Sequence, residues 1–471
     1  MKFLILPVVA FFLVGCSIEP VRPLSVVPRP EQLVWHEMEM NAFVHFSINT
    51  FTDKEWGYGD ESPQLFAPDS LDPDQWVRTF KDAGFKSVIL TAKHHDGFCL
   101  WPTKYSEHSV KNSPVKTDVV KAVSEACKKY GLNFGIYLSP WDRNHAEYGR
   151  PAYVEYYRNQ LTELFNSYGP VFEMWFDGAN GGDGYYGGAR EMRRINGSVY
   201  YEWPKTLDLV RSFNPEIIFF SDAGPGVRWV GNERGVAGET NWNTINPDTL
   251  FAGKPGIEML LNTGSEAGSQ WIPAETDVSI RPGWFYHAAQ DSLVKSPDRL
   301  FDIYLSSVGR GSTLLLNVPP DRHGRIHKQD VAALQGFRKK LDEAFAADLA
   351  PKATLSGESR GGIYMPAGLV DSKKETFWAT ADQVTSGELL VKWEEPQTVK
   401  YVVLQEPIWL GQRVRSFTIE GLVDGAWTQL AAGTTIGYKR ILKIDPVLTD
   451  QLRITIQDSK ECVALSSVKI Y

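Results

Sequence analysis

Strand-like and helix-like segments alternate along the first part of this chain, and this alternation restricts its fold more than any other feature. Short runs rich in β-branched and aromatic residues lie at residues 43–47, 87–95, 134–139, 171–178 and 216–222. Amphipathic stretches separate these runs, and several of them end in glycine, as helix C-caps do. Strand–helix–strand units at intervals of roughly 40 residues predict an α/β protein with a parallel sheet, and this many units favour a (β/α)8-type barrel.

The last strands of this barrel are less clearly marked than the first five. Residues 283–287 and 312–320 are the best candidates. We therefore expect a TIM-like barrel over residues 22–350 and leave open that it is distorted or incomplete.

The character of the chain changes at residue 351. A last helical segment gives way to short runs that alternate between apolar and polar residues up to residue 471. This alternation predicts a β-sandwich over residues 351–471, which resembles discoidin-like and carbohydrate-binding modules. Such a module either binds sugar or is a structural unit docked on the barrel. We favour the structural interpretation, because no clear constellation of surface aromatic residues can be identified.

The N-terminus has the pattern of an export signal. Lys2 precedes an apolar run, and residues 13–16 read LVGC, similar to the lipobox of bacterial lipoproteins. The apolar run is too short to span a bilayer. Residues 1–16 are thus expected to be a lipoprotein signal peptide, with Cys16 as the lipidated residue and the protein in the periplasm or at the cell surface. An ordinary cleaved signal peptide is the alternative.

Composition excludes several classes of partner. The formal net charge of −8 argues against binding to nucleic acid, whose partners usually carry a basic patch. Beyond the signal segment only Cys99, Cys127 and Cys462 remain, which is neither a disulfide framework nor a CxxC metal motif. The 15 tryptophans mostly fill core, although their flat apolar faces also suit sugar rings. Any contact with a membrane is expected only through the N-terminal lipid.

Polar residues follow four successive predicted strands. His45 ends the first strand, His94 and His95 end the second, Tyr137 lies at the end of the third, and Asp177 ends the fourth. In a barrel of this type the carboxyl ends of the strands meet at one rim, where the chemistry occurs. A single histidine there is usually structural, but the joint placement of these side chains indicates an active site.

Asp177 stands between a buried strand and a glycine-rich segment, residues 178–188. A carboxylate in this position can bind a metal, act as a base or a nucleophile, or cap a helix. Hydrolysis of a glycoside with retention needs a second carboxyl group about 5–5.5 Å away. Asp222, Glu233 and Glu239 are the candidates, and we interpret Asp222 as the cap of a following helix.

Several motifs together resemble the α-L-fucosidases of glycoside hydrolase family 29. In chain order they are HFSINTFTDKEWGYG, AKHHDGFCLWPT, GIYLSPWD, MWFDGANG and RWVGNERG. The resemblance covers residues 30–345, nearly the whole predicted barrel. The motifs SPWD, GNERGVAG and RPGWFYH are more similar to the branch that cleaves α-1,3- and α-1,4-linked fucose from branched, Lewis-type glycans than to the broad-specificity branch.

The resemblance implies retaining hydrolysis by double displacement. Asp177 matches the nucleophile of the family's WFDG motif, and Glu233 matches the acid/base of the GNE motif, with Glu239 as the second choice. Glu233 is then expected to have a raised pKa in the resting enzyme, which falls once Asp177 is covalently capped. No cofactor or metal is implied.

The resemblance also assigns a pocket for terminal fucose on an oligosaccharide. Residues that match contacts to fucose hydroxyls or ring faces are His45, Glu55, Trp56, His94, His95 and Tyr137. Trp284 matches an aromatic residue near the sugar's methyl group, and Trp141 and Asp142 are expected to contact the neighbouring sugar. The glycine-rich segment 181–204 is expected to form part of the rim.

Two other functions compete with this interpretation. In a metal-dependent barrel hydrolase, His45, His94, His95 and Asp177 would be ligands. Adjacent residues on a strand point to opposite faces, and the HxH spacing typical of such barrels is absent, so this is disfavoured. A glycan-binding lipoprotein without activity would be expected to lack a catalytic carboxylate, and both Asp177 and Glu233 are present.

Overall fold

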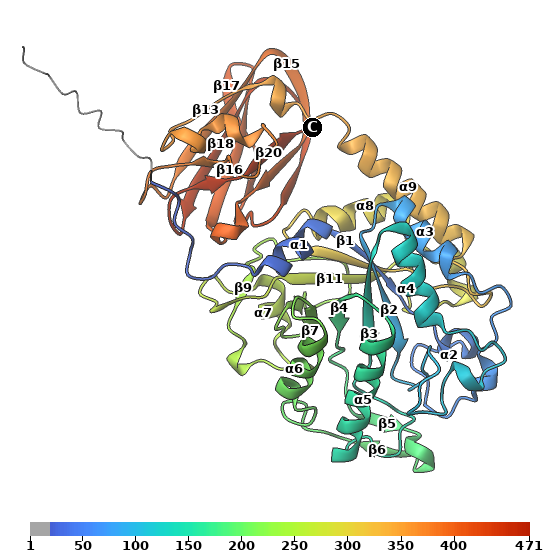
Figure 1. The fold of residues 1–471 in the computed structure, drawn as a ribbon. Helices are drawn as coiled ribbons and strands as arrows, with labels where there is room; N and C mark the ends of the chain where they lie inside the picture. Colours follow the sequence, from blue (N-terminus) through green and yellow to red (C-terminus); the bar gives the residue numbers. More distant parts are fainter. Residues whose placement is uncertain (1–18) are drawn as a thin grey trace, which may run out of the picture.

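The computed structural model describes residues 19–471, which form a barrel followed by a β-sandwich (Figure 1). The predicted signal peptide and Cys16 lie outside the described residues. Within residues 19–471, no helix has the length and apolar character needed to cross a membrane.

Eight parallel strands close the barrel, which confirms the predicted fold class. Around the barrel their order is β1-β12-β11-β8-β7-β4-β3-β2. The strands are β1 (Met40–Val44), β2 (Ser87–Lys93), β3 (Asn133–Leu138), β4 (Val171–Trp175), β7 (Ile218–Ser221), β8 (Val227–Trp229), β11 (Ala274–Ser279) and β12 (Thr313–Asn317).

Helices cover the outside of the barrel between most strands (Figure 1). The helices of residues 19–350 are α1 (Pro30–Met38), α2 (Ile48–Thr52), α3 (Pro73–Ala83), α4 (Val119–Tyr130), α5 (Pro151–Ser167), α6 (Trp203–Phe213), α7 (Glu258–Thr263), α8 (Pro297–Ser306) and α9 (Lys328–Ala344). Asp72 and Asp118 cap the N-termini of α3 and α4 through their side chains, and left-handed Gly84 and Gly131 end these helices as predicted.

The barrel departs from the regular strand–helix pattern after β7. Residues 222–226 join β7 directly to β8 without a helix, and the connection from β8 to β11 contains α7 and the strand pair β9 (Thr244–Ile245) and β10 (Gln270–Trp271). The prediction of a strand at 283–287 was wrong, because these residues form a loop after β11. The side chains of Glu55 and Asn317 hold this loop through hydrogen bonds to its backbone.

A small apolar cluster fills the barrel interior under the rim. Phe43, Tyr137, Trp175 and Phe220 belong to it, together with fully buried Trp35 of α1. The rings of Trp175 and Phe220 are stacked with their centroids 3.8 Å apart. This filling makes the barrel a packed core and gives the rim a rigid floor.

The C-terminal domain is built on a six-stranded antiparallel sheet, consistent with a β-sandwich, and α9 leads into it from the barrel (Figure 1). The strands of this sheet are β13 (Thr354–Ser356), β15 (Gly387–Gln405), β16 (Val414–Val423), β17 (Ala426–Gly433), β18 (Arg440–Ser459) and β20 (Ser467–Ile470). A separate pair is formed by β14 (Trp378–Ala379) and β19 (Ala464–Leu465). The domain is docked on the barrel: the Tyr438 ring stacks on His36 of α1, and Gln412 accepts a hydrogen bond of 2.8 Å from the Asn243 amide nitrogen.

Candidate active site

His45 follows β1 and is held as a neutral imidazole. Its Nδ1 lies 2.8 Å from the side-chain oxygen of Asn317, and burial lowers its pKa to about 3. The amide nitrogen of Asn317 donates to Ser279 and to the Trp284 carbonyl, which fixes the amide so that its oxygen faces His45. Nδ1 therefore carries the proton, and Nε2 is left as a hydrogen-bond acceptor.

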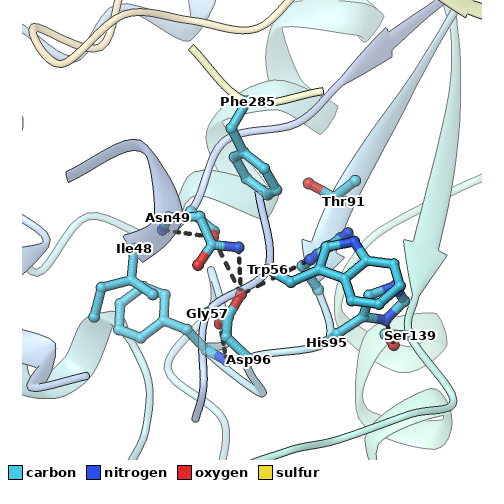
Figure 2. A network of polar contacts seen from close by, with 12 residues as sticks. Ile48, Asn49, Trp56, Gly57, Thr91, His95, Asp96, Ser139 and Phe285 are labelled. Carbon is cyan, nitrogen blue, oxygen red and sulfur yellow. Dashed lines mark hydrogen bonds and ion pairs between the residues drawn. The ribbon is translucent and has the colours of Figure 1, made fainter. Parts of the chain in front are cut away.

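His94 and His95 lie side by side beyond the end of β2. The strand ends at Lys93 and the chain turns, which brings the two rings together with their centroids 4.1 Å apart. The expectation that they point to opposite faces was wrong, because it holds only within a strand. His95 Nδ1 lies 2.7 Å from the Ser139 hydroxyl (Figure 2). This hydroxyl itself donates to the Trp141 carbonyl. His95 therefore donates from Nδ1, and its Nε2 is an acceptor.

A buried carboxyl group supports this histidine turn. Asp96 accepts a hydrogen bond of 3.0 Å from the Asn49 side chain (Figure 2). It also accepts one of 2.7 Å from the Phe98 amide. Burial raises its pKa to about 7. Gly57 packs so closely that a Cβ atom there would lie 2.8 Å from the Asp96 Cβ, so only glycine fits without displacing this network.

Asp177 lies just beyond β4 with its carboxylate fixed on both oxygens. Oδ1 accepts a hydrogen bond of 2.6 Å from the Ala179 amide, and Oδ2 accepts one of 3.0 Å from the Tyr137 hydroxyl. His95 Nε2 lies 3.8 Å from the same Oδ2. Burial raises the pKa of Asp177, while the two hydrogen bonds oppose that rise.

Aromatic side chains surround these polar groups. The Tyr137 ring is stacked with His94, their centroids 5.9 Å apart. Trp56 is exposed at the rim, 52% of its surface being accessible, and its ring meets those of His95 and Trp141 edge-on. The site thus combines an apolar wall with hydrogen-bonding groups, the composition expected for binding a neutral sugar.

Glu233 lies on the rim in the loop after β8. Its Oε2 accepts a hydrogen bond of 3.2 Å from the indole nitrogen of Trp284. Partial desolvation raises the pKa of Glu233, and the negative charges of Asp177 and Glu55 raise it further. The two predicted catalytic carboxyl groups thus act on each other electrostatically.

The loop that carries Trp284 is attached to Glu55. The Glu55 carboxylate accepts hydrogen bonds from the amides of Trp284 at 2.7 Å and Phe285 at 3.3 Å. The centroid of the Trp284 ring lies 5.1 Å from that of the His45 ring. Glu55 therefore fixes one wall of the site from the segment after α2.

The three other carboxyl groups considered from the sequence have different surroundings, and Asp222 lies against the loop after Asp177, where a Cβ atom on Gly178 would lie 2.0 Å from its Oδ2. Asp142 is buried beneath the rim and forms an ion pair of 3.1 Å with buried Lys93. Glu239 is exposed and pairs with Arg310 at 3.1 Å, next to the sandwich. The interpretation of Asp222 as a helix cap was wrong, because no helix follows β7 and Asp222 instead accepts a 2.7 Å hydrogen bond from the Gly253 amide.

Sequence reasoning missed the residues that orient the site from a distance. Asn317 ends β12 and holds His45, and Asp277 on β11 accepts a 2.9 Å hydrogen bond from the indole of Trp229. His287 contacts Glu55 at 2.6 Å. Only Asn317 had a local signal, since it is a polar residue at the end of an apolar strand candidate. Within residues 19–471, no group of three or more His, Cys, Asp or Glu side chains is arranged to hold a metal ion.

Comparison with known proteins identifies the family. The profile of the α-L-fucosidase family matches residues 23–342, and the F5/8 type C domain matches residues 352–467. Alpha-L-fucosidase 1 of Arabidopsis thaliana is 38% identical over 95% of this chain and 88% of its own length.

Solved structures agree with this match over both domains. The crystal structure of a glycoside hydrolase 29 family member from an unknown rumen bacterium has a TM-score of 0.86 and 44% identity, covering 95% of this chain and 78% of that one. A Ruminococcus gnavus family 29 fucosidase in complex with fucose has a TM-score of 0.86 and 33% identity, covering 98% and 97%. The chain therefore belongs to the α-L-fucosidases of glycoside hydrolase family 29.

Proposed function

We propose that this α-L-fucosidase is a retaining exo-enzyme that removes terminal α-1,3- and α-1,4-linked fucose from branched, Lewis-type glycans. The observation that carries the proposal is the environment of Asp177. Its carboxylate is fixed by Tyr137 and Ala179, and its charge acts on Glu233, the second carboxyl group on the rim.

In the first step, Asp177 attacks the anomeric carbon of fucose and Glu233 protonates the departing glycosidic oxygen. The raised pKa of Glu233 keeps a proton available for this transfer. Once Asp177 is esterified its negative charge is gone, so the pKa of Glu233 falls. Glu233 can then act as a base and deprotonate the water that releases fucose.

Neutral acceptors suit a sugar that carries no charge. The Nε2 atoms of His45 and His95 are free to accept hydrogen bonds from fucose hydroxyls, and Glu55 offers carboxylate oxygens beside them. Trp284 offers an apolar face for the methyl group at C6. A substrate without a matching hydroxyl would leave these buried groups unpaired, which favours fucose over other sugars.

The preference for α-1,3/1,4 linkages rests on the motifs SPWD, GNERGVAG and RPGWFYH. The rim elements that meet the neighbouring sugars in this proposal are exposed Trp56 and the hairpin of β5 (Gly182–Gly184) and β6 (Glu191–Arg193), with buried Trp141 as its support. Trp141 packs under this hairpin and donates to the Tyr186 hydroxyl at 3.0 Å. Broad linkage specificity is the alternative.

The proposed location is the periplasm or the cell surface, with a lipid on Cys16 as the only membrane contact. Metabolic labelling with a radioactive fatty acid tests this. The natural chain should be labelled and a Cys16→Ala variant should not. Equal labelling of both, or of neither, contradicts the lipoprotein assignment.

Fucose release tests the linkage preference and the roles of the two carboxyl groups. We would measure fucose released from a Lewis-type trisaccharide and from an α-1,2-fucosylated disaccharide. Each substrate is incubated with the natural enzyme and with its Asp177→Ala and Glu233→Ala variants. Release from the trisaccharide alone, abolished by both substitutions, supports the linkage and both roles. Equal release from both substrates indicates broad specificity, and near-full activity of Glu233→Ala removes this residue as the acid/base.

A further inference from the structure

We propose that His287 is a positioning residue: as an imidazolium it holds Glu55, and through Glu55 and Trp284 it sets the orientation of Glu233. The inference rests on the proposed role of Glu233 as acid/base. His287 lies in the loop after β11, and its side chain is 12% exposed.

The His287 ring bridges two carboxylates. Nδ1 lies 2.8 Å from Asp53 Oδ1, and Nε2 lies 2.6 Å from Glu55 Oε1. A neutral imidazole has only one N–H and can donate to only one of them. With neutral His287, one ring nitrogen would direct its lone pair at a carboxylate. The bridge therefore requires the protonated ring. The pKa of His287 agrees with this, because burial lowers it but the hydrogen bonds and charges of Asp53 and Glu55 together raise it above its usual value.

Glu55 transmits this bridge to the catalytic loop. The oxygen that contacts His287 also accepts the Phe285 amide at 3.3 Å, and the other oxygen accepts the Trp284 amide at 2.7 Å. Glu55 packs closely against this loop, since a Cβ atom on Gly283 would lie 2.3 Å from Glu55 Oε1. The Trp284 indole then donates to Glu233 at 3.2 Å. Four consecutive contacts thus connect Asp53 to the proposed acid/base.

The charges around His287 determine the direction of the pH effect. Asp53 and Glu55 face the ring, and Arg322 from the loop after β12 reaches Asp53 at 3.8 Å. Lys54, which lies between the two carboxylates in sequence, pairs instead with Glu61. The bridge is intact below the pKa of His287 and is lost as the pH rises through it. Catalysis should weaken over the same range.

The decisive experiment is a double-mutant cycle between Asp53→Asn and His287→Gln, read as pH–rate profiles. Asp53 has a left-handed backbone with φ of 60°, which asparagine tolerates well, so the substitution removes the charge and keeps the turn. In the natural enzyme Asp53→Asn should move the alkaline limb to lower pH, because His287 loses a stabilising anion. In the His287→Gln background it should not move that limb.

Leaving-group dependence separates the route through Glu233 from a general defect. His287→Gln should lower kcat/KM for the natural glycan by about tenfold, because small displacements of catalytic groups are costly. The value of kcat/KM reports formation of the glycosyl-enzyme, so with an aryl fucoside whose phenol leaves without protonation it should change far less. The matched control is the exposed pair His323 and Asp69, 2.9 Å apart, where Asp69→Asn and His323→Gln should leave both profiles unchanged.

Two results overturn the inference. One is an alkaline limb of the pH–rate profile that shifts equally with Asp53→Asn in both backgrounds, and the other is an equal loss of kcat/KM on both substrates. Failure of the proposed function looks different, because Glu233→Ala would then hydrolyse the natural glycan at near the natural rate whatever the His287 variants do.

Discussion

Glu275→Gln is expected to stabilise the barrel at alkaline pH. Glu275 of β11 and Glu173 of β4 are fully buried inside the barrel, where burial raises the pKa of both carboxyl groups and the Glu275 charge raises that of Glu173 further. Glu275 accepts a hydrogen bond of 3.0 Å from the Trp175 indole. Glutamine has nearly the same shape, can still accept that bond, and can donate to Glu173 without titrating.

The magnitude follows from the raised pKa. Burial raises the pKa of Glu275 from 4.5 to about 7. A group whose pKa is higher in the folded chain stabilises it fully below the unfolded value and loses that contribution as the pH rises through the folded value. The difference corresponds to about 3 kcal/mol of unfolding free energy, lost between about pH 4.5 and pH 7. A shift in Tm of roughly 5 °C is expected for a domain of this size.

Differential scanning calorimetry between pH 5 and pH 9 measures this effect. The Tm of the natural enzyme should fall relative to that of Glu275→Gln as the pH rises, while exposed Glu216→Gln should follow the natural enzyme. Parallel Tm curves for the natural enzyme and Glu275→Gln would refute the reasoning, as would a variant that is less stable at pH 9.

Further predictions concern the nucleophile and the need for metal. Tyr137→Phe removes the 3.0 Å hydrogen bond to Asp177, so the pKa of Asp177 should rise and the acid limb of kcat/KM should move to higher pH. In Gly178→Ala the new Cβ would lie 2.0 Å from an Asp222 oxygen, so the loop that carries Asp177 must shift. The kcat for fucose release should fall about a hundredfold, and a Tm equal to that of the natural enzyme would show that the loss is not due to unfolding. Dialysis against EDTA should leave kcat unchanged, and a loss that zinc restores would contradict a hydrolysis carried by two carboxyl groups.

The first half of the barrel could be predicted because its strands are apolar runs that end in polar residues. His45 and Asp177 illustrate this, since each lies just beyond a strand whose own residues are buried. β11 was missed for the opposite reason. It carries Glu275 and Asp277 into the barrel interior, so its sequence does not look like a buried strand.

The loop 283–287 shows a second limit of sequence reasoning. Its aromatic residues indicate a strand, but the Trp284 and Phe285 amides donate to Glu55 instead of to a neighbouring strand. Glu55 is far away in the sequence, and no local pattern relates it to this loop. The wrong prediction that His94 and His95 point to opposite faces has a local cause. The strand ends at Lys93, so the alternation of faces along a strand does not apply to these two residues.

The distribution of charge in the site follows from the proposed chemistry. Positive charge develops on the sugar ring in an oxocarbenium-like transition state, and a carboxylate stabilises it best where no cation competes. His45 and His95 touch the pocket and are neutral, since burial lowers both pKa values to about 3. The protonated histidine of the proposal, His287, contacts Glu55 and Asp53, so its charge is taken up by two carboxylates. The fold thus uses a cation to position the site and offsets its charge locally, while the histidines that touch the pocket stay neutral.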